Sequence, residues 1–275
     1  MRTKIGIIGC GMISDVYMKN WTTIYKDIIE IKAIADIIPE VAEKKAKKYN
    51  TKAVTVEELL ADPEIQIIAN LTIPAAHTSV NRQCLEAGKS VYCEKPFALS
   101  LEEAKEILAL ARSKGLMACS APDTFLGPGL QTCRRVIDSG EIGDIVGCTA
   151  NLVSHGHETW HANPAFLYKK GAGPMLDMGP YYVAAMISLL GPVGKVNCFA
   201  NRAFDQRLIT SKPHAGEIID VEVYTNYVAS LCFRSGAIGN FNMSYDIWWS
   251  KLPGIEIYGT KGTLVVPDPN MFAGP

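Results

Sequence analysis

The sequence predicts an α/β protein with two domains: a doubly wound parallel sheet, followed by an α+β domain with a mainly antiparallel open sheet. Over the first 120 residues, apolar strand segments alternate with helical segments, the pattern of a parallel sheet with helices on both faces. From Ile145 onward strands dominate, and the turns at residues 234–236 and 260–262 join successive strands as hairpins. We therefore expect domains of residues 1–121 and 122–275.

The elements of the first domain follow from apolar runs and from helix start and stop signals. A capping box of Ser100 and Glu103 starts the last long helix, which Gly115 ends, and Gly88 ends the helix before it. The expected strands are residues 5–8, 30–36, 53–54, 65–71, 90–93 and 116–119. The expected helices are residues 14–25, 39–49, 56–61, 75–87 and 100–114.

The second domain is predicted to contain few helices and several long strands. One helix, residues 129–138, precedes Gly140, and another, residues 180–190, ends at Gly191. The expected strands are residues 145–154, 193–201, 220–233, 237–246 and 254–266.

Composition and charge exclude several classes of function. The 275-residue chain is 48% hydrophobic and 20% charged, with a net charge of −1, and its lysines at residues 44–48 fit an exposed helix face better than a nucleic-acid surface. No apolar run is long enough to span a membrane, and the first strand begins too early for a signal peptide, so we expect a cytoplasmic protein. The eight cysteines form no C-x-x-C pair and are expected to be reduced.

Residues 9–14, Gly-Cys-Gly-Met-Ile-Ser, join the first strand to the first helix in the pattern of a dinucleotide site. Gly9 permits the tight turn, Gly11 lets a pyrophosphate approach the backbone, and the small Ser14 lets helix and strand pack closely. The N–H groups at the helix start then face the phosphates, so the cofactor-binding loop includes Met12 and Ile13.

Asp36 ends the second strand, 22 residues after Ser14, close to the spacing of the acid that binds the ribose. Its carboxylate would accept hydrogen bonds from the ribose hydroxyls and repel a 2′-phosphate. Because no Arg or Lys follows at once, NAD is favoured over NADP. The alternative is an ordinary βαβ unit with a chance glycine turn.

Three residues are candidates for catalysis. Lys95 follows a predicted parallel strand at its C-terminal end, where doubly wound folds bind ligands, and can reach a substrate oxygen beside the nicotinamide. Asp177 and Tyr181, four residues apart around the helix start at Pro180, can face one cleft. A tyrosine hydroxyl whose pKa is lowered by a nearby ammonium serves as an acid/base for carbonyl–alcohol chemistry. The competing interpretations are a surface lysine before a turn and a helix cap beside a packed aromatic residue.

Residues 157–161, His-Glu-Thr-Trp-His, match the zincin pattern H-E-x-x-H, which needs a sustained helix to bring both histidines to the zinc. Gly156 precedes the segment and Pro164 follows it, so a helix is disfavoured. We expect instead a loop that lines a polar pocket and holds no metal. Trp160 would form an apolar floor for a sugar ring, with His161 beside it.

Together these motifs resemble the Gfo/Idh/MocA family of NAD(P)-dependent sugar oxidoreductases, over essentially the whole chain. The segments that carry the resemblance are residues 9–14, residues 71–74 with His77, residues 94–96 and residues 173–181. The resemblance implies a Rossmann domain followed by an α/β domain whose open sheet often builds homodimers or homotetramers.

The resemblance also implies roles for single residues. Lys95 and Asp177 would help to hold the substrate hydroxyls while hydride passes at the nicotinamide C4. Thr72, His77 and Glu94 would lie along the cofactor.

Two features depart from the family pattern. Many members carry a histidine acid/base four residues after the aspartate, whereas this chain has Tyr181, as in the branch that includes glucose–fructose oxidoreductase, where a tyrosine takes that role. Residues 268–275 look like the middle of a loop where members continue, so we expect a truncated or incomplete chain.

The leading hypothesis is an NAD-dependent oxidoreductase that transfers hydride between the nicotinamide and a carbinol carbon of a sugar or cyclitol. Tyr181 would exchange the hydroxyl proton, Lys95 would lower the pKa of Tyr181 and bind the same oxygen, and Asp177 would orient Lys95 or a neighbouring hydroxyl. The alternatives are a redox-neutral glycosidase that keeps NAD bound, a non-catalytic sugar or nucleotide sensor with this fold, and, more remotely, a zinc hydrolase. The expected partners are a small substrate and further copies of the chain, without nucleic acid or membrane.

Overall fold

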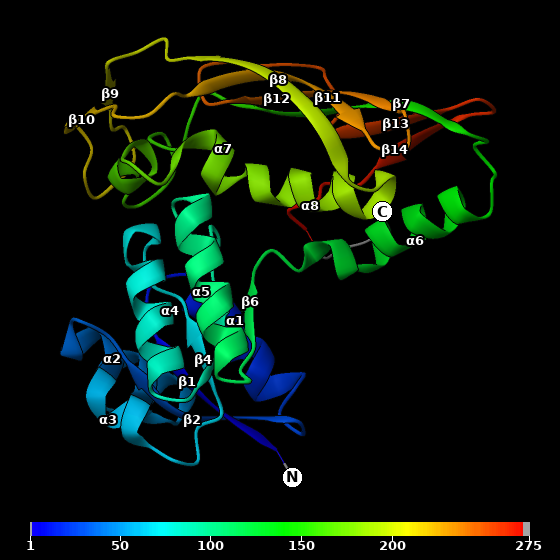
Figure 1. Ribbon diagram of the computed structural model, residues 1–275. Helices are drawn as coiled ribbons and strands as arrows, with labels where there is room; N and C mark the ends of the chain where they lie inside the picture. Colours follow the sequence, from blue (N-terminus) through cyan, green and yellow to red (C-terminus); the bar gives the residue numbers. More distant parts are fainter. Residues whose placement is uncertain (1, 272–275) are drawn as a thin grey trace. The chain divides into compact units, whose positions relative to one another are not determined.

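Two six-stranded sheets organise the chain, one in each of its two compact units, Met1–Ala121 and Pro122–Pro275 (Figure 1). The structure is a computed structural model and describes residues 2–271. The last part of the expected C-terminal loop, residues 272–275, lies outside the described residues. No helix among the described residues is long and apolar enough to cross a membrane.

The sheet of the first unit has the strand order β3-β2-β1-β4-β5-β6, and its paired strands run parallel. This confirms the predicted doubly wound sheet. The strands are β1 Thr3–Ile8, β2 Ile29–Ala35, β3 Lys52–Ala53, β4 Ile67–Asn70, β5 Ser90–Cys93 and β6 Ala118–Ser120. The α-helices are α1 Ser14–Thr23, α2 Pro39–Tyr49, α3 Val56–Ala61, α4 His77–Glu86 and α5 Leu101–Ser113.

Neighbouring side chains of the central strand β1 are buried on opposite faces of this sheet. Ile8 packs in a cluster with Leu85 of α4 and Ile107 of α5, whereas Ile7 packs with Met18 of α1. Side chains alternate between the faces of a strand, so a continuous apolar run is stable only where helices cover both faces. The same layering brings the C-terminal ends of β1, β2, β4 and β5 to one edge of the sheet.

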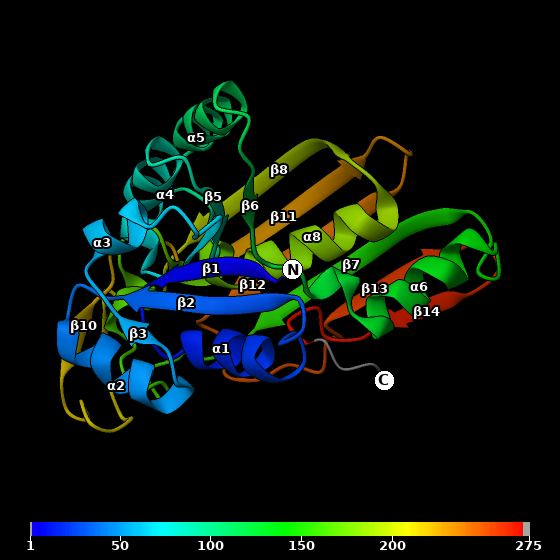
Figure 2. The ribbon, with the colours of Figure 1, turned by 90° about the horizontal axis from the view of Figure 1, so that it is seen from below.

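The sheet of the second unit has the order β14-β13-β7-β12-β11-β8 and is mainly antiparallel, as predicted, with one parallel pair between β12 and β7. Its strands are β7 Ile145–Val153, β8 Val193–Asn201, β11 Asn226–Phe233, β12 Ile238–Ser244, β13 Ile255–Gly259 and β14 Thr263–Val266. Helices α6 Pro128–Asp138 and α8 Gly179–Leu190 pack with one face of the sheet (Figure 2).

The prediction of one long strand over residues 220–233 is wrong. The chain forms β10 Ile218–Asp220, which pairs with β9 Gln206–Leu208 in a separate two-stranded sheet, before it enters β11. The two parts bury their apolar side chains in different places, because Ile219 packs with Tyr168 and Tyr245, whereas Leu231 packs in the main core.

The helix predicted over residues 180–190 is α8, with Pro180 in its first turn, but an additional short helix that was not predicted precedes it. A short helix, α7 Gly173–Asp177, ends at Asp177, and α8 begins two residues later. Gly173 adopts a φ of +78°, and a Cβ there would lie 3.1 Å from the carbonyl oxygen of Tyr224. Pro174 at the first turn suits a helix start. Asp177 therefore ends one helix rather than capping the next.

Candidate active site

The glycine turn after β1 has the shape that a dinucleotide requires. Gly9 has a φ of +98°, and a Cβ there would lie 2.6 Å from the backbone carbon of Leu71, so no other residue fits without backbone movement. Beside Gly11 the space within 4 Å of a Cβ position is open, which leaves room for a pyrophosphate against the backbone. Ser14 is fully buried, and its hydroxyl donates to the carbonyl of Gly11 at 2.7 Å, which fixes the turn against α1.

Asp36 follows β2 and is fixed beside this turn. Its carboxylate accepts hydrogen bonds from the backbone N–H of Cys10 at 2.7 Å and of Ile38 at 2.9 Å. Burial, and then the charge of Asp36, raise the pKa of the Cys10 thiol to about 12, so this thiol is neutral and unreactive. The position of the carboxylate fits the ribose-binding role expected from its spacing.

A buried polar network joins the ends of β4 and β5. Asn70 accepts a hydrogen bond from the Thr72 hydroxyl at 2.7 Å and donates to Asn81 at 2.8 Å. His77 has no exposed surface, and its ring nitrogens lie 2.6 Å from the carbonyl oxygen of Pro96 and 3.1 Å from that of Thr72. His77 thus ties together the two turns that bear Thr72 and Lys95.

Glu94 anchors the position of Lys95. The side chain of Glu94 is buried. It accepts one hydrogen bond from the Tyr17 hydroxyl at 2.7 Å and another from the backbone N–H of Lys95 at 3.0 Å. Burial, and then the charge of Glu94, raise the pKa of Tyr17, so its hydroxyl stays protonated and continues to donate. Lys95 itself is partly exposed at the end of β5.

In the second unit, Asp177 lies beside two residues that the sequence interpretation missed. The Tyr245 hydroxyl donates to Oδ2 of Asp177 at 2.7 Å, and Nε2 of His157 lies 3.8 Å from the same oxygen. Tyr245 is fully buried, and burial followed by the charge of Asp177 raises its pKa well above the ordinary value, so it remains a donor. His157 belongs to the H-E-x-x-H pattern at residues 157–161. No local sequence pattern indicates that Tyr245, which follows β12, lies beside Asp177.

Residues 157–161 form a turn and not a helix. Glu158, the general base of the zincin pattern, is instead buried in an ion pair with Arg207 at 2.7 Å and accepts a hydrogen bond from Tyr168. Trp160 is 64% exposed, and its ring centroid lies 5.0 Å from that of His157 and 5.5 Å from that of His161. In the part of the chain that the structure describes, no three His, Cys, Asp or Glu side chains are grouped so that they could hold a metal ion.

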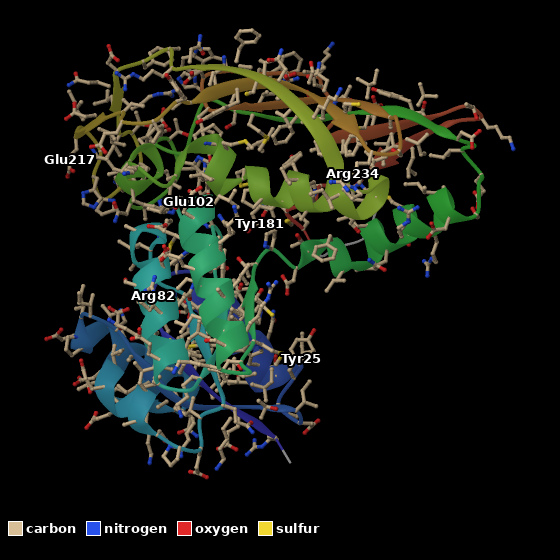
Figure 3. The ribbon with its side chains drawn as sticks, viewed as in Figure 1. Tyr25, Arg82, Glu102, Tyr181, Glu217 and Arg234 are labelled. Atoms are coloured by element: carbon tan, nitrogen blue, oxygen red, sulfur yellow. The ribbon has the colours of Figure 1, made fainter. Side chains whose placement is uncertain are left out.

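Tyr181 lies in the first turn of α8 (Figure 3) and is partly buried against the main core of the second unit. Within this unit the structure groups Asp177 with His157 and Tyr245, and places Trp160 next to His157. Within the first unit it groups the glycine turn with Asp36, and Lys95 with Glu94.

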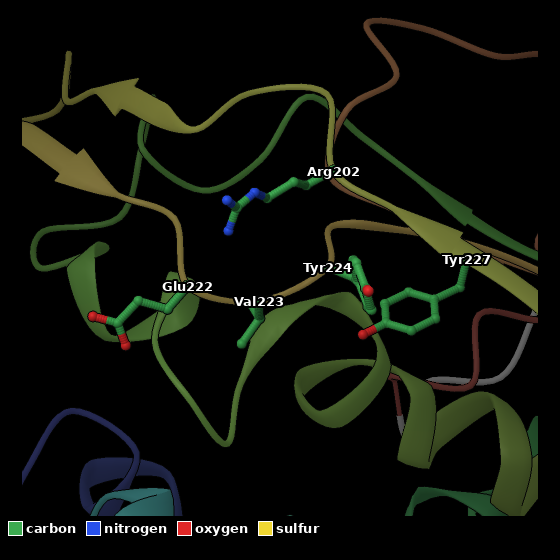
Figure 4. Close-up of a pocket in the computed structure, with 5 residues that line it drawn as sticks. All are labelled: Arg202, Glu222, Val223, Tyr224 and Tyr227. Atoms are coloured by element: carbon green, nitrogen blue, oxygen red, sulfur yellow. The ribbon is translucent and has the colours of Figure 1, made fainter.

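A separate pocket of about 570 Å³ opens in the second unit (Figure 4). The residues that line it are Arg202, Glu222, Val223, Tyr224 and Tyr227. Its two charged side chains are already paired, because Arg202 contacts Asp205 and Glu222 contacts Lys169. None of the residues predicted from the sequence to be catalytic lines this pocket.

A parallel sheet, an open glycine turn and an acid fixed at the end of the second strand are the features of a Rossmann-type dinucleotide-binding domain. The chain belongs to the GFO/IDH/MocA oxidoreductase family. Residues 3–121 match its NAD-binding Rossmann fold, and residues 130–265 match its C-terminal domain. Both the predicted family and the predicted NAD-binding domain are therefore confirmed.

The relatives of this chain include dehydrogenases. Trans-1,2-dihydrobenzene-1,2-diol dehydrogenase of Mus musculus is 28% identical over 95% of this chain and 74% of its own length. A solved NAD-binding oxidoreductase from Klebsiella pneumoniae is 25% identical, with a TM-score of 0.81 over 95% of this chain and 72% of its own. Levoglucosan dehydrogenase, solved with NADH and L-sorbose, shares the fold at 22% identity, with a TM-score of 0.82 over 96% and 72% of the two chains.

Proposed function

We propose that this protein is an NAD-dependent dehydrogenase that oxidises a ring hydroxyl of a sugar or cyclitol, or reduces the corresponding carbonyl. The observation that carries the proposal is the grouping of a carboxylate, an imidazole and an exposed indole at Asp177, His157 and Trp160. Hydroxyls pair with the two polar groups, and the apolar face of a ring packs on an indole. The names of the relatives, a diol dehydrogenase and a levoglucosan dehydrogenase, support the same substrate chemistry.

The cofactor would be held by the glycine turn and by Asp36. The open space beside Gly11 suits the pyrophosphate, and the carboxylate of Asp36 suits two ribose hydroxyls while disfavouring a 2′-phosphate. When bound, NAD supplies the acceptor for the hydride.

The residues of the chain would provide the proton transfer and the orientation of the substrate. The Lys95 ammonium would bind the reacting oxygen and stabilise the negative charge that develops on it. Tyr181 would accept the hydroxyl proton as the hydride leaves the carbon. Asp177, held as a carboxylate acceptor by Tyr245, would orient a substrate hydroxyl.

The first experiment is mass spectrometry of nucleotide released from the denatured protein, followed by a sugar and cyclitol panel read by the absorbance of reduced nicotinamide. Reduction of NAD with one member of the panel would establish the dehydrogenase. Bound NAD with no reduction on any member, in either direction, would contradict it and favour a redox-neutral glycosidase or a sensor.

Asp36→Asn is expected to raise the Kd for NADH by about 10- to 100-fold, because the ribose hydroxyls lose a charged acceptor. The variant should also discriminate less against NADPH, since the amide does not repel a 2′-phosphate. Titration of NADH and NADPH fluorescence measures both effects, with Asp27→Asn, at an exposed aspartate, as the control. Tighter binding of NADPH than of NADH by the unaltered protein would contradict the assignment of Asp36.

A further inference from the structure

We propose that Lys45 is a positioning residue of the cofactor site: it holds the carbonyl group of Gly11 so that the backbone N–H of Met12 is presented to the pyrophosphate of NAD. This inference rests on the proposed binding of NAD at the glycine turn and does not depend on the substrate or on the reaction. It starts from the ammonium of Lys45, which lies 3.2 Å from the carbonyl oxygen of Gly11 although 34 positions separate the two residues along the chain.

Lys45 belongs to α2, which packs against α1 next to the glycine turn. Met18 of α1 shares a buried cluster with Ala42 and Ala46 of α2, and the small alanine side chains let the two helices approach closely. Lys45 directly precedes Ala46, and only 12% of its side chain is exposed. Its ammonium is therefore held at the start of α1 and is not free to move through the solvent.

A carboxylate fixes the ammonium of Lys45 in this place. Nζ of Lys45 lies 2.9 Å from Oδ2 of Asp15, in the first turn of α1, and the Tyr49 hydroxyl donates to Oδ1 at 2.8 Å. The ammonium groups of Lys45 and then of Lys48 hold the pKa of Asp15 well below its usual range, so Asp15 is charged at neutral pH. An ammonium has three N–H donors, so that of Lys45 serves Asp15 and the Gly11 carbonyl at once.

The carbonyl of Gly11 in turn determines where the next N–H points. It accepts hydrogen bonds from Lys45 and from the Ser14 hydroxyl, the latter at 2.7 Å. The peptide between Gly11 and Met12 is trans and planar, so its N–H points in the direction opposite to its carbonyl. Donors from the two helices thus direct the N–H of Met12 to the outside of the turn, where Met12 is 64% exposed and the space beside Gly11 is open.

The charge of Lys45 strengthens this arrangement. A hydrogen bond from an ammonium is about twice as strong as one between neutral groups, so Lys45 holds the Gly11 carbonyl more firmly than the Ser14 hydroxyl alone. A cation on the carbonyl also polarises the peptide, which makes the N–H of Met12 a better donor to an anion. Since phosphates bind to backbone N–H groups at the start of a helix, Lys45 should contribute to pyrophosphate binding through the backbone.

The test compares ligands that contain the pyrophosphate with one that lacks it. Lys45→Met keeps an unbranched side chain without the ammonium and should raise the Kd for NADH and that for ADP-ribose by the same factor, about 5- to 20-fold. The Kd for adenosine, which has no phosphate, should change by less than about two-fold. NADH fluorescence gives the first Kd, and displacement of NADH gives the other two. Lys45→Gln, which is also neutral, should give the same result and provides the measurement if Lys45→Met does not fold.

Lys48→Met is the matched control for the loss of a positive charge. Lys48 pairs with the same carboxylate at 2.8 Å through a side chain that is 60% exposed, and its loss leaves the contact of Lys45 with Gly11 in place. Each Kd should therefore change by less than about two-fold in this variant. Lys45→Arg keeps the charge and the donors, and should bring the Kd for NADH back to within about three-fold of that of the unaltered protein.

Unchanged Kd values for NADH and ADP-ribose in Lys45→Met would overturn the role of Lys45 while leaving NAD binding intact. An equal loss of adenosine affinity would overturn it as well, because it would indicate that the whole site is disrupted. The same holds if Lys48→Met weakens ADP-ribose as much as Lys45→Met does, since net charge alone would then explain the effect. Failure of the unaltered protein to bind NADH would instead overturn the proposed cofactor site itself, and this inference with it.

Discussion

Replacement of Lys95 by alanine is expected to lower kcat by about 10²- to 10⁴-fold, the usual contribution of a group that stabilises charge and assists proton transfer. The Kd for NAD should change by less than about three-fold, because the proposed contacts to the nucleotide, from the glycine turn and Asp36, do not involve this ammonium. The backbone N–H of Lys95 donates a hydrogen bond to the carboxylate of Glu94. Replacement of the Lys95 side chain by alanine leaves this hydrogen bond intact. Steady-state rates and fluorescence titration of NADH measure the two effects separately.

Lys105→Ala, at an exposed lysine of α5, is the matched control for loss of a positive charge and should retain full activity. Lys95→Arg should not restore turnover, since a guanidinium is bulkier and holds its donors in a fixed plane. Equal losses of kcat and NAD affinity in Lys95→Ala would contradict the assignment, because they would place the lysine on the cofactor rather than on the reacting oxygen.

The second large effect is expected on stability. Arg207→Ala should lower the free energy of unfolding by about 3–5 kcal/mol, because it leaves two buried carboxylates without their cation. The side chain of Arg207 is 4% exposed, and its partners Glu158 and Asp246 are 4% and 7% exposed. The guanidinium also donates to the backbone carbonyls of His155 and Tyr245, so its loss removes the contacts that join the loop of residues 155–161 to the segment that bears Tyr245.

Urea unfolding followed by tryptophan fluorescence suits this test, because three of the four tryptophans lie in the second unit. Arg82→Ala is the control, since its ion pair with Glu106 has side chains that are 41% and 63% exposed and should contribute less than about 1 kcal/mol. A similarly small loss in Arg207→Ala would mean that water reaches Glu158 and Asp246, and that the ion pairs of Arg207 do not hold the loop of residues 155–161 in place.

The NAD-binding domain could be predicted from the sequence because its signals are local. A strand, a glycine turn and a helix start lie within fourteen residues, and one acid follows at the end of the next strand, an arrangement typical of a dinucleotide site. The structure places Asp36 against the backbone of that turn as the spacing predicts. The parallel sheet follows for a similar reason, because regular alternation of strands and helices leaves few other topologies.

The surroundings of Asp177 could not be predicted in this way. Tyr245 lies 68 residues from Asp177 along the chain, and no periodicity or spacing links the two. The zincin pattern at residues 157–161 suggested a zinc site, which would require a helix. In the structure Glu158 of that pattern instead pairs with Arg207, 49 residues away along the chain. Residues 220–233 were predicted as one strand, whereas in the structure Val221 packs in one core and Leu231 packs in another.

The sequence by itself thus determined the class of fold, the family and the NAD-binding domain of this protein, because short-range geometry between neighbouring elements dictates all three. Only the tertiary structure decided which side chains surround Asp177 and that Glu158 is structural. These groups come from separate loops that are held together by one buried guanidinium, and such long-range pairing depends on how the loops pack and not on local sequence.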